Sequence, residues 1–327
     1  MNMRIIRSVI ASAIVIASSL PVAKSGEINF SFTYDSTFTS AAGSNLSSAQ
    51  SDMAYVGNYL SSVIKTSGDF DVTMKFTISG FSDSQTSNLG SAGSSFFGFS
   101  HSFNKTVTQE FAQTGVNPAG ANADAGNATF NFGKTWGFGG SVTSEQIDFR
   151  YVVLHEMTHA MGFVGLIGSS GTTTAATPGF YGWMDQYMYG WNSTTSQYEP
   201  LVQEIDNVMV SMTGASAAVV NSVHPVQFRG ANVQAYLGVQ NSGQNMYTPL
   251  PFSSGSSLYH VNVPGDLMYY AVSNGPKTFG YTGLDLAFLK DFGYVVVPEP
   301  STYVLSCVVV IALAIFGKRR RTALAVA

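Results

Sequence analysis

Residues 155 to 159 of this 327-residue chain read His-Glu-Met-Thr-His. On a helix, positions four apart lie on one face about one turn apart, so the imidazoles of His155 and His159 can reach the same metal ion. Glu156 follows the first ligand and can take a proton from a metal-bound water on the open side of the ion. Zinc lowers the pKa of such a water toward ~7, so a nucleophile is available near neutral pH. The stretch predicts a catalytic zinc site with His155 and His159 as ligands and Glu156 as the base.

The surroundings of this motif support the prediction, although so short a pattern also occurs by chance. Apolar residues flank it at helical positions: Val152, Val153, Leu154, Ala160, Met161 and Phe163. Only five histidines occur in the chain, and three of them are His155, His159 and His260. The alternative is a helix that carries two unrelated histidines on its surface.

A catalytic zinc needs a third protein ligand. The short metzincin spacing would place a third histidine at position 165, which is a glycine, and a thermolysin-like site would need a glutamate, but none occurs between Glu156 and Glu199. Two candidates remain. The first is His260, followed by Pro264-Gly265 and Asp266-Leu267-Met268, and the second is Asp185. We expect the other two histidines, His101 and His224, to be structural or to lie on the surface.

The segment from His155 to Phe163, His-Glu-Met-Thr-His-Ala-Met-Gly-Phe, resembles the leishmanolysin-like branch of the metzincin zinc peptidases. In that branch a long insertion separates the HExxHxxGF helix from the third histidine, and a Met-turn follows. The resemblance implies that His260 is the third ligand and that Met268 is the Met-turn residue beneath the metal. It also implies that Tyr270, two positions later, binds zinc or steadies the oxyanion, although a core aromatic is the alternative. Leu284–Leu289 resembles the helix that closes such domains.

The N-terminus has the pattern of a secretory signal peptide at residues 1–25. Arg4 and Arg7 precede an apolar run from Ser8 to Leu20, and Ala23-Lys24-Ser25 offers small residues for cleavage. The run is short for a membrane span, which takes about 20 apolar residues. An uncleaved N-terminal anchor is the alternative.

The C-terminus, residues 297–327, combines Pro298-Glu299-Pro300 with an apolar run from Tyr303 to Phe316 and the basic end Lys318–Arg321. An apolar helix followed by cations is a stop-transfer signal. The order of these parts resembles the PEP-CTERM sorting signal of Gram-negative bacteria. That resemblance implies processing by an exosortase-type enzyme, transient anchoring in the inner membrane, and delivery to the cell surface or extracellular matrix. A plain C-terminal anchor is the alternative, and both interpretations export residues 26–296.

The charge and cysteine content of the chain argue against two further classes of function. The two ends hold seven of the 15 Lys and Arg but only one of the 19 Asp and Glu, so the exported part has eight cations, eighteen anions and a net charge of −10. Such an acidic chain without a basic patch argues against nucleic acid as a partner. The only cysteine, Cys307, lies in the C-terminal apolar run. The exported part therefore uses no thiol for catalysis or metal binding and has no disulfide.

The order of predicted elements gives an α+β fold for residues 26–296. Period-two alternation predicts strands at 27–34 and 71–78, and a short strand is expected at 128–133. Helical spacing predicts helices at 46–64 and 282–292, and a third helix should begin at the cap Ser144 and end near Gly162. Residues 80–127 are expected to be loops with one or two strands. We expect a metzincin-like domain with an N-terminal subdomain of sheet and helices and an irregular C-terminal subdomain.

These observations predict a secreted zinc metalloendopeptidase that hydrolyses extended peptide segments of its protein substrates. A non-catalytic zinc-binding surface or matrix protein is the alternative from another class, and zinc-dependent hydrolysis of a non-peptide bond is a third interpretation. Glu156 distinguishes the first from the second, because a structural zinc site closes its fourth position and has no use for a base.

Overall fold

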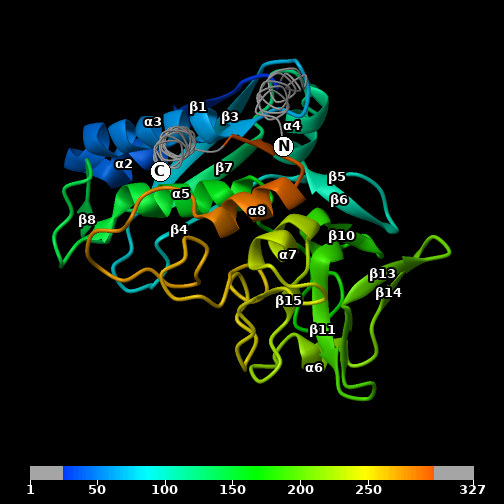
Figure 1. The fold of residues 1–327 in the computed structure, drawn as a ribbon. Helices are drawn as coiled ribbons and strands as arrows, with labels where there is room; N and C mark the ends of the chain where they lie inside the picture. The colour runs from blue at the N-terminus through cyan, green and yellow to red at the C-terminus, as the bar shows by residue number, and fades with distance from the viewer. Residues whose placement is uncertain (1–24, 298–327) are drawn as a thin grey trace, which may run out of the picture.

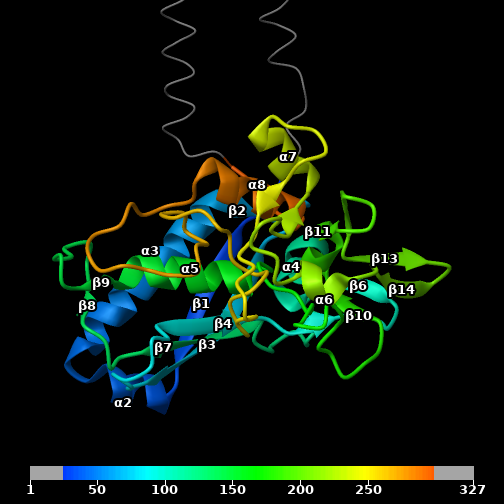
Figure 2. The same cartoon turned by 90° about the horizontal axis from the view of Figure 1, so that it is seen from below.

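The computed structural model of the chain describes residues 25–297 (Figures 1 and 2). The predicted signal peptide and sorting signal lie outside these residues, apart from Ser25 and Val297 at their borders. Among the described helices, none combines the length and hydrophobicity that crossing a bilayer requires.

A four-stranded sheet forms the first half of the molecule, in the order β1, β3, β7, β4. Its strands are β1 (Ile28–Tyr34), β3 (Val72–Phe81), β7 (Gly126–Asn131) and β4 (Gly90–Gly93). The first three are parallel, and β4 runs antiparallel to β7 at the edge. Alternate residues of β3 are buried because one face of the sheet packs against helices. The predicted strands at 27–34 and 71–78 are confirmed, and the strand expected at 128–133 lies two residues earlier, at 126–131.

Two helices lie side by side on one face of this sheet, α3 (Leu46–Val63) and α5 (Phe149–Ala160) (Figure 1). The predicted helix at 46–64 is confirmed, since Met53, Val56 and Leu60 are completely buried at helical spacing. A shorter helix, α2 (Ser36–Ala42), packs near β3 and is followed by the 3-10 turn η1 (Gly43–Asn45).

The prediction that α5 begins at Ser144 is wrong. Residues 147–148 form a short strand, β9 (Ile147–Asp148), that pairs with β8 (Trp136–Gly137), so the chain is extended until Asp148. The side chain of Asp148 then accepts a hydrogen bond from the N–H of Tyr151 and caps the helix. The ring of Phe149, in the first turn, packs against four aromatic rings between residues 130 and 138. This aromatic cluster anchors the start of the motif helix against the sheet.

Residues 80–127 contain more regular structure than predicted. Besides β4 they include β5 (Phe96–Phe97), β6 (Ser102–Thr106) and a helix, α4 (Val107–Thr114). Thr106 and Gln109 form a reciprocal capping box at the start of α4, and Gly115 ends it in a left-handed conformation. This two-turn helix has only a weak sequence signal, because its few apolar positions lie within a Ser- and Gly-rich segment.

The second half of the molecule consists of small sheets, short helices and loops (Figures 1 and 2). Its strands are β10 (Phe180–Gly182), β11 (Met188–Asn192), β12 (Gln197–Pro200), β13 (Val202–Ile205), β14 (Val208–Ser211), β15 (Gln227–Phe228) and β16 (Gln244–Asn245). Its helices are η2 (Trp183–Tyr187), α6 (Ala215–Ala218) and α7 (Ala231–Leu237). The strand β10 continues the first half, because it pairs with β6.

The last helix, α8 (Gly283–Asp291), joins the two halves. The ring of Phe288 packs against Phe163, just after α5, and against Phe228 of β15. Strand β17 (Val295–Val296) then returns to pair with β2 (Ile64–Lys65) at the end of α3. The predicted helix at 282–292 is confirmed, with Thr282 as its N-cap. The fold is mixed α+β, as predicted, and it brings the loop around residue 260 to face α5.

Candidate metal centre

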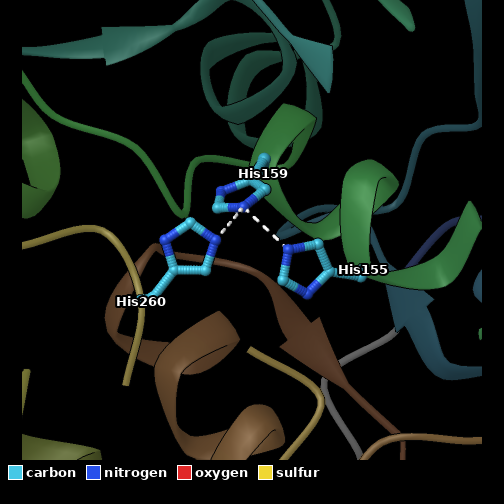
Figure 3. Close-up of side chains that lie close together, drawn as sticks. All are labelled: His155, His159 and His260. Carbon is cyan, nitrogen blue, oxygen red and sulfur yellow. Dashed lines mark hydrogen bonds between the residues drawn. The ribbon is translucent and has the colours of Figure 1, made fainter. Parts of the chain in front are cut away.

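Three histidine side chains converge between α5 and the loop of residues 256–261 (Figure 3). The Nε2 atom of His159 lies 3.2 Å from Nε2 of His155 and 3.2 Å from Nε2 of His260. His155 and His260 are buried, and His159 is partly exposed, so the cluster can be reached from the surface. The structure thus brings together the two histidines of the predicted helix and the predicted third ligand, which is 101 residues away in sequence.

Each imidazole is oriented by a backbone carbonyl at its other nitrogen. The Nδ1 atom of His155 lies 2.6 Å from the carbonyl oxygen of Leu267, and that of His159 lies 2.8 Å from the carbonyl of Phe163. In the same way, Nδ1 of His260 lies 2.9 Å from the carbonyl of Ser256. A carbonyl oxygen can only accept, so all three Nδ1 atoms carry the proton and donate it. The three Nε2 atoms then face the centre of the cluster.

None of the three Nε2 atoms carries a proton, so their lone pairs face one another. Burial and the neighbouring imidazoles lower the pKa of His155 to about 3 and that of His159 well below its ordinary value, and burial also lowers the pKa of His260. The rings are therefore neutral near pH 7, with Nε2 as an acceptor. Two acceptors cannot form a hydrogen bond with each other, so the contacts at 3.2 Å call for a cation between the nitrogens.

The geometry of the cluster fits a zinc ion. Zinc binds imidazole nitrogens at about 2.0–2.1 Å, so at tetrahedral angles two ligand nitrogens lie about 3.3 Å apart. The two Nε2–Nε2 separations that involve His159, 3.2 Å each, are close to this value. Within residues 25–297, no carboxylate or thiol joins the three histidines. Three histidines leave the fourth tetrahedral position open, as in catalytic zinc sites.

Backbone geometry explains how the loops reach the helix. Gly162 has a φ of +104°, which an L side chain rarely adopts, and this turn lets the Phe163 carbonyl fold back to His159. On the other side, Val261 donates its N–H to the carbonyl of Met268 and pairs with Tyr269. The loop that carries His260 is thereby bonded directly to the predicted Met-turn segment.

That segment lies against the histidines. Met268 is completely buried, and the carbonyl of Leu267, just before it, orients His155. The N–H of Met268 donates to the carboxylate of Asp266, which closes a tight turn after Gly265. Met268 therefore lies next to the histidine cluster, as predicted. The hydrogen bond to the cluster is made by the carbonyl of the preceding residue, Leu267, and not by the side chain of Met268.

Glu156 lies on α5 next to His155 and is 7% exposed. Its side chain lies against the edge strand β4, because a Cβ atom at Gly90 would lie 3.3 Å from Cγ of Glu156. Burial raises the pKa of Glu156 to about 8, whereas a divalent cation at the adjacent histidines would favour the ionised form. A buried carboxyl group whose pKa is displaced toward neutrality suits a proton acceptor.

The remaining candidates lie elsewhere. Asp185 is completely buried, and it accepts hydrogen bonds from the backbone of Leu166 and Gly182 and from the hydroxyl of Tyr259, outside the histidine cluster. Burial raises the pKa of Asp185 to about 6. Tyr270 is 39% exposed, and its ring stacks on that of Tyr247 with the ring centroids 3.7 Å apart. Its predicted role at the metal stays a prediction.

The two other histidines lie apart from the cluster, as expected. His224 stacks on Trp191 at a ring distance of 4.2 Å, and His101 lies in an exposed loop with a φ of +61°. Sequence reasoning missed the three carbonyls that orient the ligands, because a backbone oxygen leaves no signature in the sequence. It also missed Tyr259, although this residue directly precedes the predicted ligand His260.

Comparison of the chain with models of known protein families, with curated proteins and with solved structures found no match.

Proposed function

We propose that this chain is an exported zinc-dependent endopeptidase of the metzincin type. The observation that carries the proposal is the convergence of three neutral, carbonyl-oriented histidines beside a buried glutamate. Zinc ligands commonly donate their second ring nitrogen to a carbonyl in this way, which sets the tautomer and the ring orientation. Three histidines with an open fourth position form the ligand set of a catalytic site rather than of a structural one.

The residues of the site have distinct roles in the proposed reaction. His155, His159 and His260 would hold the zinc ion, which when bound lowers the pKa of a coordinated water and polarises a carbonyl group. Glu156 takes the proton from that water and passes it to the leaving amine. Its side chain lies against β4, and its burial keeps bulk water from competing for the proton.

The position of β4 supports a peptide as the substrate. This strand lies at the edge of the four-stranded sheet and pairs with β7 on one side only. An edge strand offers unpaired backbone groups to which an extended peptide can add as a further strand. Because Glu156 lies against Gly90 of β4, a peptide along this edge would pass next to the proposed base.

The substitution Glu156→Gln tests the proposal, because it removes the base and leaves the three ligands. We expect full zinc content by metal analysis and a loss of casein hydrolysis on the order of 10²–10⁴-fold. The matched control is Glu110→Gln, which changes a glutamate on α4 that pairs with Lys105. A wild-type protein that binds zinc but hydrolyses no peptide would instead favour a non-catalytic zinc-binding surface protein.

A further inference from the structure

A buried aspartate and a partly buried tyrosine lie near the histidine cluster and take no part in the proposed reaction. Asp185 is 0% exposed and lies on the 3-10 turn η2, while Tyr259 directly precedes the ligand His260. The hydroxyl of Tyr259 lies 3.0 Å from Oδ1 of Asp185. A buried carboxylate is costly to desolvate unless it is fully hydrogen-bonded, so this pair calls for an explanation.

The pair binds one particular segment, the loop that follows α5. Oδ2 of Asp185 accepts from the N–H of Leu166 at 2.8 Å and from that of Gly182 at 2.8 Å. The hydroxyl of Tyr259 accepts from the N–H of Ile167 at 2.6 Å. Two consecutive backbone N–H groups of this loop, those of Leu166 and Ile167, thus donate hydrogen bonds to the carboxylate and to the phenol hydroxyl. The loop has no regular secondary structure at residues 163–166, and these bonds hold it, together with the bond from the N–H of Thr174 to the carbonyl of Leu166.

Gly165 shows how closely the three parts fit. A Cβ atom at this position would lie 2.1 Å from Oδ1 of Asp185 and 2.5 Å from a ring carbon of Tyr259. Any side chain here would push the carboxylate and the phenol away from the loop. Short-spaced metzincins have their third histidine at the position of Gly165. Here the side chains of Asp185 and Tyr259 occupy the space that a side chain at this position would need.

The two segments joined in this way each orient one of the metal ligands. The loop after α5 begins with Phe163, whose carbonyl accepts from Nδ1 of His159. The segment that ends in Tyr259 and His260 begins with Ser256, whose carbonyl accepts from Nδ1 of His260. The Nε2 atoms of His159 and His260 lie 3.2 Å apart. A shift between the two segments would change this distance.

We propose that Asp185 and Tyr259 are positioning residues of the metal centre, which hold the His260 loop against the loop that orients His159. The inference rests on the proposed function only in that the three histidines bind a metal ion. It gives Asp185 a role at the site without making it a ligand. The pair substitutes for the short covalent spacing that places the third histidine in a compact HExxHxxGxxH motif.

The test compares metal binding by purified variants, with zinc affinity and the visible spectrum of the cobalt-substituted protein as readouts. Tyr259→Phe removes only the hydroxyl, and Asp185→Ala removes the acid. Outer contacts of metal ligands are worth about 10–100-fold in metal affinity, and we expect both variants to bind zinc on the order of tenfold more weakly with an altered cobalt spectrum. Asp185→Asn should have nearly the zinc affinity and cobalt spectrum of the wild type, because its amide still accepts from two N–H groups and donates to Tyr259.

Matched controls separate positioning from general stability. Asp291 is also a buried carboxylate that accepts from backbone N–H groups, those of Asn232 and Val233, and Tyr187 donates its hydroxyl to the carbonyl of Asp291. Asp291→Ala and Tyr187→Phe should lower the melting temperature and leave the cobalt spectrum unchanged.

A second readout needs no metal. In the metal-free Tyr259→Phe protein, amide hydrogen exchange should rise in both 163–167 and 256–260, because the bond joins these two segments. Unchanged zinc affinity, cobalt spectrum and exchange in Tyr259→Phe and Asp185→Ala would overturn the inference. A wild-type protein that binds neither zinc nor cobalt would overturn the proposed function instead.

Discussion

Two buried aspartates connect the Met268 segment to the last helix, and their ionisation gives a sharp prediction about stability. Asp266 and Asp285 are 8% and 2% exposed, and their carboxyl groups are in hydrogen-bonding contact. Oδ2 of Asp285 accepts from the N–H and hydroxyl of Thr282, but its Oδ1 has no N–H or O–H donor. A bond between two carboxyl groups exists only while one of them keeps its proton.

The sign and size of the effect follow from this contact. Burial, together with the charge of Asp266, raises the pKa of Asp285 from 3.8 to about 7. The protonated form is therefore favoured in the folded state, and its contribution to stability is full below pH 4 and is lost as the pH rises through about 7. At 1.36 kcal/mol for each pKa unit, this rise corresponds to about 4 kcal/mol of folding free energy as an upper value.

The substitution Asp285→Asn should remove this dependence on pH. The amide oxygen of Asn can still accept from Thr282, and its NH₂ group donates to Asp266 as the protonated acid does. We expect the variant to unfold at nearly the same urea concentration as the wild type at pH 4.5. At pH 8.5 we expect it to be more stable, by about 1–4 kcal/mol.

The assay is urea unfolding in EDTA at both pH values, so that metal binding contributes nothing to the difference. Asp291→Asn is the control, because Asp291 is a buried carboxylate on the same helix that accepts only N–H groups. It should gain no stability at pH 8.5. If Asp285→Asn is destabilised equally at both pH values, the shared proton does not exist and the reasoning fails.

Three further predictions concern the metal, the core and the tail. His260→Ala should lose zinc on dialysis against a weak chelator, whereas His224→Ala, whose ring stacks on Trp191, should retain it; metal analysis of both variants decides the third ligand. Arg150→Ala should cost about 3–5 kcal/mol in urea unfolding, because it leaves the buried carboxylate of Asp52, now 2.6 Å from the guanidinium Nε, without its cation. If the C-terminus is a sorting signal, mass spectrometry of the protein from its native host should find a C-terminus near residue 300, and an intact basic end would favour a plain membrane anchor.

Much of the candidate site could be predicted because helical geometry converts sequence spacing into distance. His155 and His159 are four apart on a helix, so their proximity needs no tertiary information. The third ligand could be predicted only by elimination and resemblance, since nothing in the local sequence shows that residue 260 returns to α5. The strands β1 and β3 were readable because each buries alternate residues against a helical layer.

What could not be predicted depends on contacts across long stretches of chain. The carbonyl that orients His155 comes from Leu267, 112 residues later. The start of α5 was placed at Ser144 because serine is a common cap, but pairing of β8 with β9 holds the chain extended to Asp148. In both cases a tertiary interaction decided between local conformations that the sequence alone permits.

Residues 25–297 contain no cysteine, so no disulfide secures the loops around the candidate metal site. Two of the three carbonyls that orient the histidines come from the loops of Phe163 and Ser256, and the third, of Leu267, lies in the turn before Met268. Disulfides often secure such loops in exported proteins, but here buried carboxyl groups are bonded to the same segments. Asp185 holds the loop after Phe163, and Asp266 with Asp285 holds the turn at Met268.

Such bonds differ from disulfides in one physical respect, because their strength depends on protonation and on complete hydrogen bonding. Removing one partner leaves a buried polar group unsatisfied, which costs about 1–3 kcal/mol. A substitution that removes the bonding group, Asp185→Ala or Asp285→Ala, should therefore disturb the geometry of the three histidines, although neither aspartate belongs to the histidine cluster. The candidate metal centre therefore depends on these buried networks as well as on the three histidines, and we expect variants that keep every histidine but break a network to bind zinc more weakly.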